Sequence, residues 1–278
     1  MQLLIDGDLI AFRCAASVGD DGSEEIAILR SDRLMQDLLH STEADTYQVF
    51  LTGSGNFRRK VNPEYKANRK DKTPPIYLQA CREFLVKEWK AEVSDGCEAD
   101  DLMGINQNER DTMIASLDKD MLMVPGWHFN WLHNERKYVV PEEGIKTFYK
   151  QMLIGDRSDN IFGVDKIGKV KAERYIEPLE TEEDMICQVL DLYGTDIVRF
   201  LMNAQCLWIM QNEGETWVQR TKHLTLPAPL QLEVEAMLSS MRFSMNATST
   251  EPISNPVKIS GIPAVGILPE SIPISPVL

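Results

Sequence analysis

The sequence is poor in the residues that build disulfide frameworks and zinc sites. Its five cysteines include no CxxC pair, and its four histidines do not join them at zinc-ligand spacing. His128 and His133 lie in the aromatic stretch GWHFNWLH, where packing in the core is the better interpretation. We therefore expect reduced, mostly buried thiols and no zinc centre.

Long apolar runs are also missing. No segment has the unbroken apolar length of a membrane span, and the chain opens on MQLLIDGD without a basic leader or an apolar signal core. With 278 residues, 43% of them hydrophobic and 26% charged, the chain is long enough for one large α/β domain and a small appendage. These features predict a soluble protein of the cytoplasm without a membrane partner.

Positive charge is scarce, because 29 Lys and Arg face 43 Asp and Glu, for a net charge of −14. Taken alone, this argues against nucleic acid, which binds through its phosphates to Lys and Arg. The basic residues are nevertheless concentrated between Phe57 and Lys72, where the only acids are Glu64 and Asp71. That segment carries Arg58, Arg59, Lys60, Lys66, Arg69, Lys70 and Lys72. A local basic patch is therefore expected in an acidic protein.

Short apolar runs alternate with amphipathic segments in the first half of the chain. Pro63, Pro74 and Pro75 make the basic segment a loop or a short helical excursion. We expect strands at residues 2 to 6, 47 to 53, 91 to 96 and 112 to 118, and helices at 9 to 17, 30 to 41, 76 to 90 and 97 to 108. This alternation predicts an α/β fold with a parallel sheet flanked by helices.

The second half has the pattern of helices. We expect one helix from Pro141 to residue 154 and helical structure across residues 181 to 220. Between them, residues 163 to 176 should form a turn with a glycine, followed by a helix. From about residue 227 proline and serine are frequent, which predicts a flexible tail whose short apolar patches are available to a partner. The chain is thus divided into an α/β part (1–140), a helical part (141–225) and a flexible tail (226–278).

Acidic residues form tight groups beside these apolar segments. They are Asp6, Asp8, Glu98, Asp100, Asp101, Asp118, Asp120, Asp156 and Asp159. Several follow expected strand ends, and open parallel sheets bind ligands in the crevice outside the carboxyl ends of their strands. Carboxylates held together repel one another, so such a cluster implies divalent cations. Mg²⁺ or Mn²⁺ suits an all-oxygen set, and two such ions about 4 Å apart catalyse in-line attack of water on a phosphate.

Two of these groups also have a simpler interpretation. Glu98 and Asp101 lie three residues apart, as do Asp156 and Asp159, so each pair can point inward from one helix face. An acidic N-cap turn at residues 98 to 101 and a C-cap role for Gly155 explain the same patterns without metal.

The segment GVDKIGKVKAERYI, residues 163 to 176, resembles a helix-hairpin-helix. Gly163 and Gly168 allow backbone N–H groups to approach a phosphate, and Lys166, Lys169 and Lys171 add positive charge. Because such contacts do not distinguish bases, we expect this segment to bind a nucleic-acid backbone.

Five ordered motifs resemble the bacteriophage 5′-to-3′ exonucleases and flap endonucleases, which are related to the 5′-nuclease domain of bacterial DNA polymerase I. The motifs are IDGD (5–8), NFRRKVNPEYKANRK (56–70), EADD (98–101), SLDKD (116–120) and GDRSDNIFGVDKIG (155–168), within roughly residues 1 to 220. The resemblance implies a PIN-like 5′-nuclease core in which residues 56–75 form an arch, and a DNA-binding helical region with the helix-hairpin-helix at 155–176. It also implies metal-dependent hydrolysis of DNA near 5′ ends, nicks or flaps, in phage replication or recombination in the host cytoplasm.

The resemblance assigns roles to individual residues. A site for two metal ions is implied at Asp6, Glu98, Asp100, Asp101, Asp118, Asp120, Asp156 and Asp159, with Asp6, Asp118, Lys66 and Arg69 catalytic. DNA contacts are implied for Arg58, Tyr65, Lys66, Arg69, Lys70, Gly163, Lys166, Gly168, Lys169 and Lys171, with Tyr65 stacking on a displaced base. A potassium ion at the helix-hairpin-helix is implied as well, without identified ligands. Asp8 is expected to support the site rather than bind metal.

The chain departs from the family pattern in two places. An acid usually ends the second strand, whereas LTGSGNF places Gly53 or Ser54 there, which predicts weaker binding of one metal and reduced activity at low Mg²⁺. The arch is also short, because Thr73, Pro74 and Pro75 follow Arg69 closely. The preferred DNA structure and the balance of exonuclease to endonuclease activity therefore stay open.

Three other functions share part of these motifs. Haloacid dehalogenase-like phosphatases share an Asp-x-Asp after a strand, but that interpretation leaves EADD, SLDKD and YKANRK unexplained. PIN-like ribonucleases share the acidic sheet without the hairpin, and an RNA-DNA hybrid remains a candidate substrate because backbone contacts do not select the sugar. A structure-specific DNA-binding module that has lost cleavage is the non-catalytic alternative.

Overall fold

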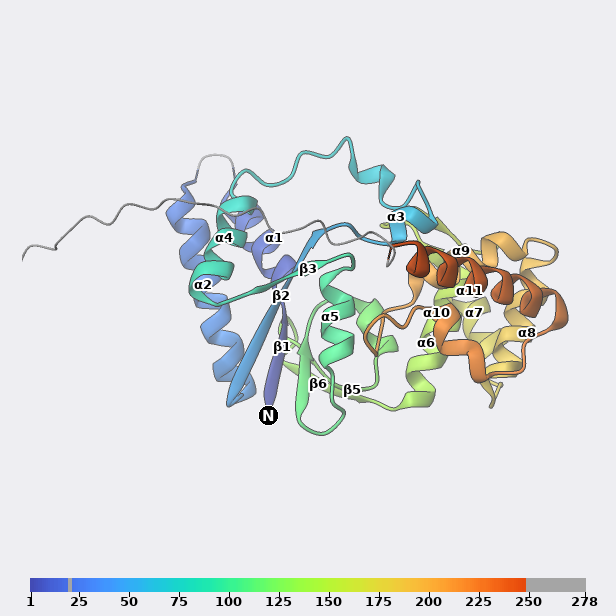
Figure 1. The fold of residues 1–278 in the computed structure, drawn as a ribbon. Coiled ribbons are helices and arrows are strands. Elements are labelled where there is room, and N and C mark those ends of the chain that lie inside the picture. Colours follow the sequence, from blue (N-terminus) through green and yellow to red (C-terminus); the bar gives the residue numbers. More distant parts are fainter. Residues whose placement is uncertain (20–21, 249–278) are drawn as a thin grey trace, which may run out of the picture. The chain divides into compact units, whose positions relative to one another are not determined.

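The computed structural model describes residues 1–19 and 22–248, and it contains a six-stranded sheet (Figure 1). The strand order is β3-β2-β1-β4-β5-β6; all neighbours are parallel except β5 and β6. The strands are β1 (Gln2–Asp6), β2 (Thr46–Ser54), β3 (Glu92–Asp95), β4 (Thr112–Ala115), β5 (Gly126–Asn130) and β6 (Glu135–Val139). The predicted parallel sheet is confirmed. The sequence did not predict β5 and β6, whose aromatic residues indicated packing rather than strands.

Alternate side chains of the central strands enter two different cores. Leu3 and Ile5 of β1 belong to a core with α1 (Gly7–Val18), α2 (Glu24–Thr42) and α4 (Leu78–Glu88). Leu4 between them belongs to the core on the other face. Because strand side chains alternate in direction, apolar residues at consecutive positions of β1 require helices on both faces.

The second core joins the sheet to the helical half. It contains Leu4 and Phe50 from the strands together with Phe148 and Trp208. Its helices are α5 (Ala99–Asn106), α6 (Pro141–Ile154), α7 (Lys169–Ile176), α8 (Glu182–Tyr193), α9 (Ile197–Leu207) and α10 (Trp217–Arg220), with the short helices η2 (Lys119–Met123) and η3 (Thr221–His223). Residues 1–238 form one compact unit.

The start of the expected tail is helical. Helix α11 covers Ala228–Thr248, and its Leu230 and Val234 are buried against the second core. The prediction of a flexible tail from residue 226 is therefore wrong for this part. The prolines that suggested disorder stand at positions 227 and 229, where a first helical turn tolerates them, and none follows until Pro252. The rest of the expected tail, residues 249–278, lies outside the described residues.

The basic segment leaves the sheet after β2 and returns at α4. It contains α3 (Arg58–Val61) and the short helix η1 (Ala67–Arg69), and the chain from there to α4 crosses as an open loop (Figure 1). This agrees with the loop and short helical excursion expected from its prolines. In the described part of the chain, no helix combines the length and the apolar character needed to cross a bilayer.

Candidate active site

The carboxyl end of β1 lies at the point where the strand order reverses, between β2 and β4. Asp6 ends β1 and caps α1, because its Oδ1 accepts the N–H of Leu9 at 3.0 Å. Its Oδ2 accepts the hydroxyl of Ser116 at 2.8 Å. Open parallel sheets bind ligands at such a reversal. Ser116 follows β4 and was not singled out from the sequence, although it lies in the SLDKD motif.

Ser116 also orders the acids that follow β4. Its Oγ accepts the N–H of Asp118 at 3.0 Å, and Asp118 caps η2 by accepting the N–H of Asp120 at 2.9 Å. The β1 and β4 ends are thereby fixed side by side, and Asp6 and Asp118 face the same crevice.

The acids of EADD begin α5. Glu98 is the N-cap and forms a capping box with Asp101, so the expected acidic N-cap turn is present, while Glu98 also lines the cleft. Asp100 lies between these two residues in the chain and lines the crevice. Burial raises its pKa there, and the charges of Asp6 and Asp118 add to the effect. A stable helix start and a cluster of cleft acids are therefore built from the same four residues.

These elements surround one cleft of about 710 Å³. It brings together acids from four separate segments with the foot of the basic loop. The charged and aromatic residues that line it are Asp6, Asp8, Arg58, Arg59, Lys60, Tyr65, Lys66, Arg69, Glu98, Asp100, Asp118, Asp120, Asp156 and Asp159. Of the expected metal ligands, only Asp101 is absent from this lining.

The cleft acids raise one another's pKa values. Burial raises the pKa of Asp6 to about 7, and the charges of Asp8 and Asp118 add to the effect. Burial and the neighbouring Asp118 likewise raise the pKa of Asp120 to about 7. The pKa values of Asp100 and Asp118 are also raised, first by burial and then by nearby carboxylates. Carboxylates are thus crowded here at a cost that bound cations would relieve.

Asp101 and Arg58 do not occupy the roles expected for them. The Asp101 carboxylate is fully buried. Its two oxygens accept hydrogen bonds from the two terminal nitrogens of Arg58, at 2.6 and 2.8 Å. Its oxygens also accept the N–H groups of Glu98 and Met210, which leaves little room for a metal. Asp101 is therefore removed from the candidate ligands. Arg58 is only 2% exposed, so it is removed from the candidate DNA contacts.

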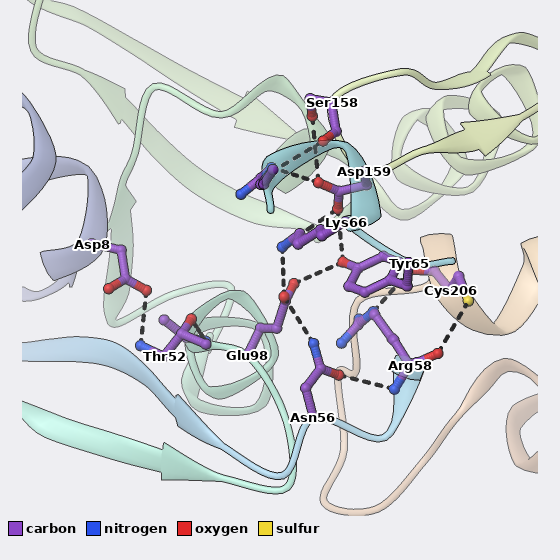
Figure 2. A network of polar contacts seen from close by, with 12 residues as sticks. Asp8, Thr52, Asn56, Arg58, Tyr65, Lys66, Glu98, Ser158, Asp159 and Cys206 are labelled. Carbon is purple, nitrogen blue, oxygen red and sulfur yellow. Dashed lines mark hydrogen bonds and ion pairs between the residues drawn. The ribbon is translucent and has the colours of Figure 1, made fainter. Parts of the chain in front are cut away.

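Tyr65 is also buried rather than available for stacking on a base. Its hydroxyl lies 3.0 Å from Glu98 Oε2 and 2.7 Å from Asp159 Oδ2, between two cleft acids (Figure 2). Burial and these carboxylates raise the pKa of Tyr65, so the phenol stays protonated as a donor. The stacking role is corrected, because the ring is only 1% exposed.

Lys66 and Arg69 stand at the foot of the basic loop and face the cleft acids. Lys66 Nζ lies 2.5 Å from Glu98 Oε1 and 3.5 Å from Asp159 Oδ2, and Arg69 Nη2 lies 2.6 Å from Asp159 Oδ1. Figure 2 shows the Lys66 side chain directed between the two carboxylates. The backbone N–H of Lys66 donates to Asp159 O at 2.9 Å, which fastens the loop to the GDRSDN turn.

Asp8 has the supporting position expected of it. Its Oδ2 accepts the N–H of Thr52 at 2.8 Å, and its Oδ1 pairs with Arg82 of α4. Arg82 also donates to the carbonyl of Thr52 at 2.5 Å. The pair therefore fixes the end of β2, and Arg82 is a residue that the sequence did not indicate.

Gly53 occupies a position without room for a side chain. A Cβ atom there would lie 2.0 Å from the carbonyl oxygen of Ser94 in β3 and 2.9 Å from Val93. An aspartate at this position would require the two strands to move apart. Gly53 lines the cleft, but a Gly53→Asp variant is not a clean test of the missing acid.

Within the expected helix-hairpin-helix region, Asp156 and Asp159 line the cleft and residues 163–176 do not. Gly163 is in close contact with the end of α6, because a Cβ there would lie 2.3 Å from Leu153 O, so its expected phosphate contact is replaced by packing. Gly168 caps α7 and has open space around it, as a phosphate approach needs. The residues exposed around it are Lys166, Lys169 and Lys171, and Lys70 of the basic loop is exposed as well.

The donor set of the cleft fits hard divalent cations. In residues 1–19 and 22–248, no three Asp, Glu, His or Cys side chains are arranged as a ready-made coordination group. The chemistry of the lining is nevertheless suitable: all candidate ligands are carboxylates, and burial raises the pKa values of Asp6 and Asp100. Oxygen-only sets that repel one another are typical of Mg²⁺ and Mn²⁺ sites.

Known proteins are similar to this chain in sequence and in fold. A 5′-3′ exonuclease of Buchnera aphidicola is 29% identical over 60% of this chain and 66% of its own length. The exonuclease of Escherichia phage T7 is 26% identical over 65% of this chain and 68% of its length. Among solved structures, a bacteriophage T5 flap endonuclease superposes with a TM-score of 0.60 at 19% identity, covering 76% of this chain and 88% of that one.

The chain thus spans just under two thirds of the Buchnera relative. At 19% identity, the likeness to the T5 enzyme shows the fold alone, and it agrees with the mixed sheet and flanking helices described above. Residues 1–150, which hold the sheet, the basic loop and most of the cleft acids, match the sequence profile described as 5′-3′ exonuclease, N-terminal resolvase-like domain. The chain therefore belongs to the 5′-3′ exonuclease N-terminal domain family.

Proposed function

We propose that the protein is a divalent-metal-dependent, structure-specific 5′-3′ exonuclease and flap endonuclease that hydrolyses phosphodiester bonds of DNA. One observation carries the proposal: acids from four segments meet in one cleft beside Lys66 and Arg69 of the basic loop, and burial raises the pKa values of Asp6 and Asp100 among them. A binding surface alone has no use for buried carboxylates, which repel phosphate unless cations neutralise them.

The cleft acids divide into those that hold cations and those that hold the cleft together. Asp6, Glu98, Asp100, Asp118, Asp120, Asp156 and Asp159 are the proposed ligands. Two divalent cations bound there supply the positive charge that polarises the scissile phosphate and activates the attacking water. Ser116 and Tyr65 hold their carboxylate partners by hydrogen bonds, so the acids keep fixed directions before the substrate arrives.

Lys66 and Arg69 contact the substrate phosphate in this proposal. Both cations already face cleft acids, so a phosphate that enters between them meets positive charge at once. The exposed lysines around Gly168 bind the duplex backbone at a distance from the cleft, which sets where along the strand the cut falls. Potassium at this turn is retained as part of the proposal, without named ligands.

The DNA substrate is supported by the relatives. The T5 flap endonuclease was solved as an enzyme-product complex with DNA and metal ions. By analogy, we propose that DNA with 5′ ends, nicks or flaps is the substrate of this chain. An RNA-DNA hybrid is proposed as a second substrate. A role in phage replication or recombination in the host cytoplasm is proposed from the phage T7 and T3 exonucleases among its relatives.

The test compares 5′-labelled duplex, nicked and flap DNA with Mg²⁺ and with EDTA, for the wild type and Asp118→Asn. The proposal predicts release of short 5′ products that needs Mg²⁺ and is lost in the variant. Binding to the same DNA without cleavage, with Mg²⁺ as well as with EDTA, would favour a DNA-binding module. Hydrolysis of small phosphomonoesters in place of DNA would favour a phosphatase.

A further inference from the structure

Arg58 and Asp101 form a buried ion pair beside the cleft. Besides its two bonds to Asp101, Arg58 donates from Nε to the carbonyl of Cys206 at 2.8 Å and from Nη2 to that of Trp208 at 2.7 Å. Only the planar fork of arginine can serve these acceptors together, because a lysine offers one point charge on a flexible stem. Burial of both partners shows that the pair is shielded from solvent and salt.

The pair ties three segments that are far apart in the sequence. Arg58 begins α3 at the foot of the basic loop, and Asp101 lies in the first turn of α5. Asp101 Oδ1 also accepts the N–H of Met210, just after α9, at 3.1 Å. Gly104 of α5 packs against the same residue, since a Cβ there would lie 2.3 Å from Met210 O. The loop foot, the α5 N-terminus and the helical half therefore meet at this pair.

The residues on either side of Asp101 are cleft acids. Asp101 Oδ2 accepts the N–H of Glu98 at 2.9 Å, and Asp100 is its neighbour in the chain. A second connection runs through Asn56, which accepts the N–H of Arg58 at 2.9 Å and donates to Glu98 Oε1 at 2.8 Å (Figure 2). Glu98 is thus held from its backbone and from its carboxylate. The first connection depends on the side chain of Arg58, through Asp101, and the second uses only its backbone N–H, through Asn56.

We propose that Arg58 is a positioning residue for the metal site: through its side-chain pair with Asp101 it directs Glu98 and Asp100 into the cleft and fixes them relative to Lys66. The inference rests on the proposed function for what these acids hold. It differs from an ordinary structural ion pair in what is lost with it. A structural pair changes the stability of the fold, whereas this pair also changes metal affinity.

The first test uses Arg58→Lys in the full chain, which keeps the charge and loses the fork. Mn²⁺ binding is measured without DNA, by calorimetry and by the electron paramagnetic resonance signal of free Mn²⁺. We expect the Kd for Mn²⁺ to rise by about 10- to 100-fold, as for other residues that orient metal ligands. The matched control is Arg220→Lys, whose arginine also forms a two-pronged pair, with Glu182, in the helical half. It should lower Tm with the Kd unchanged.

The second test adds Asp101→Asn, measured alone and in a double-mutant cycle with Arg58→Lys. If Asp101 acts through Arg58, the double variant binds Mn²⁺ about as weakly as the weaker single variant. Independent, additive losses would show that Asp101 is itself a ligand and overturn the proposal. The proposal would also be overturned if Arg58→Lys had the same Kd for Mn²⁺ as the wild type, provided that the wild type cleaves DNA. A wild type that neither binds Mn²⁺ nor cleaves would instead reject the proposed function, and this inference with it.

Discussion

Single residues decide how the acidic cleft is built, and Gly53 is the clearest case. The family pattern places an acid at the end of the second strand, and this chain has a glycine pressed against β3. The sequence indicated a missing ligand. The structure adds the reason why no side chain fits: the register of β2 against β3 shifts between Leu51 and Ser54, and the strands approach closely there.

Gly53→Ala should therefore destabilise the fold. Its new methyl group overlaps the backbone of Ser94, so we expect a loss of about 1–3 kcal/mol in the free energy of unfolding. Gly168→Ala is the control, because nothing lies within 4 Å of its Cβ position, and its change should stay within about 0.5 kcal/mol. Urea unfolding of the three proteins gives the comparison. Equal stability of the two variants would show that the β2–β3 contact is looser than described.

The raised pKa of Asp120 makes a prediction about pH. Burial raises the pKa of its carboxyl from 3.8 to about 7 on folding. Between these pH values the folded state therefore holds a proton that the unfolded chain has lost. The free energy of unfolding of the metal-free protein should then fall as pH rises from about 4 to 7, with the full penalty above that range. Asp120→Asn removes the penalty.

In EDTA at pH 8, Asp120→Asn should have a higher Tm than wild type, by about 2–4 °C for each 1 kcal/mol recovered. The difference should shrink at pH 5, where the wild-type acid is protonated. Added Mg²⁺ should raise the Tm of the wild type more than that of the variant, since bound cations offset the same repulsion. A variant that melts below wild type at pH 8 in EDTA would contradict the effect of Asp120.

At the scale of elements, the sequence predicted what periodicity and turn residues determine. Four strands, the helix from Pro141 and the loop character of the basic segment follow from local patterns. What it could not predict depends on distant contacts. Arg58 and Tyr65 looked like exposed members of a basic patch, and only tertiary packing turns them toward Asp101, Glu98 and Asp159. The acids, by contrast, were predictable, because parallel strands bring their carboxyl ends to one edge.

Helix α11 was missed because its composition resembles the segment that follows it. Leu230→Ala tests whether it belongs to the fold, since this side chain is completely buried. We expect a loss of roughly 2–5 kcal/mol in the free energy of unfolding. Leu232 is 68% exposed on the same helix, so Leu232→Ala should change stability by no more than about 0.5 kcal/mol. Similar losses of unfolding free energy for both variants would show that α11 does not pack in the core.

At the scale of the whole molecule, the net charge of −14 is compatible with the proposed DNA binding because basic residues are concentrated in the basic loop and around Gly168. The two halves share one core, so the cleft and its proposed duplex-binding turn keep a fixed separation.

The central claim is that the cleft acids form one metal site for phosphodiester hydrolysis. The most direct measurement is the single-turnover rate on a 5′-labelled flap at saturating Mg²⁺ for Asp100→Asn, with Asp37→Asn on the exposed face of α2 as control. We predict that Asp100→Asn slows cleavage by more than about 100-fold, because bound cations supply several kcal/mol of transition-state stabilisation. Binding of the flap in Ca²⁺ should persist, and Asp37→Asn should cleave at the wild-type rate. Equal rates for all three proteins would contradict the account.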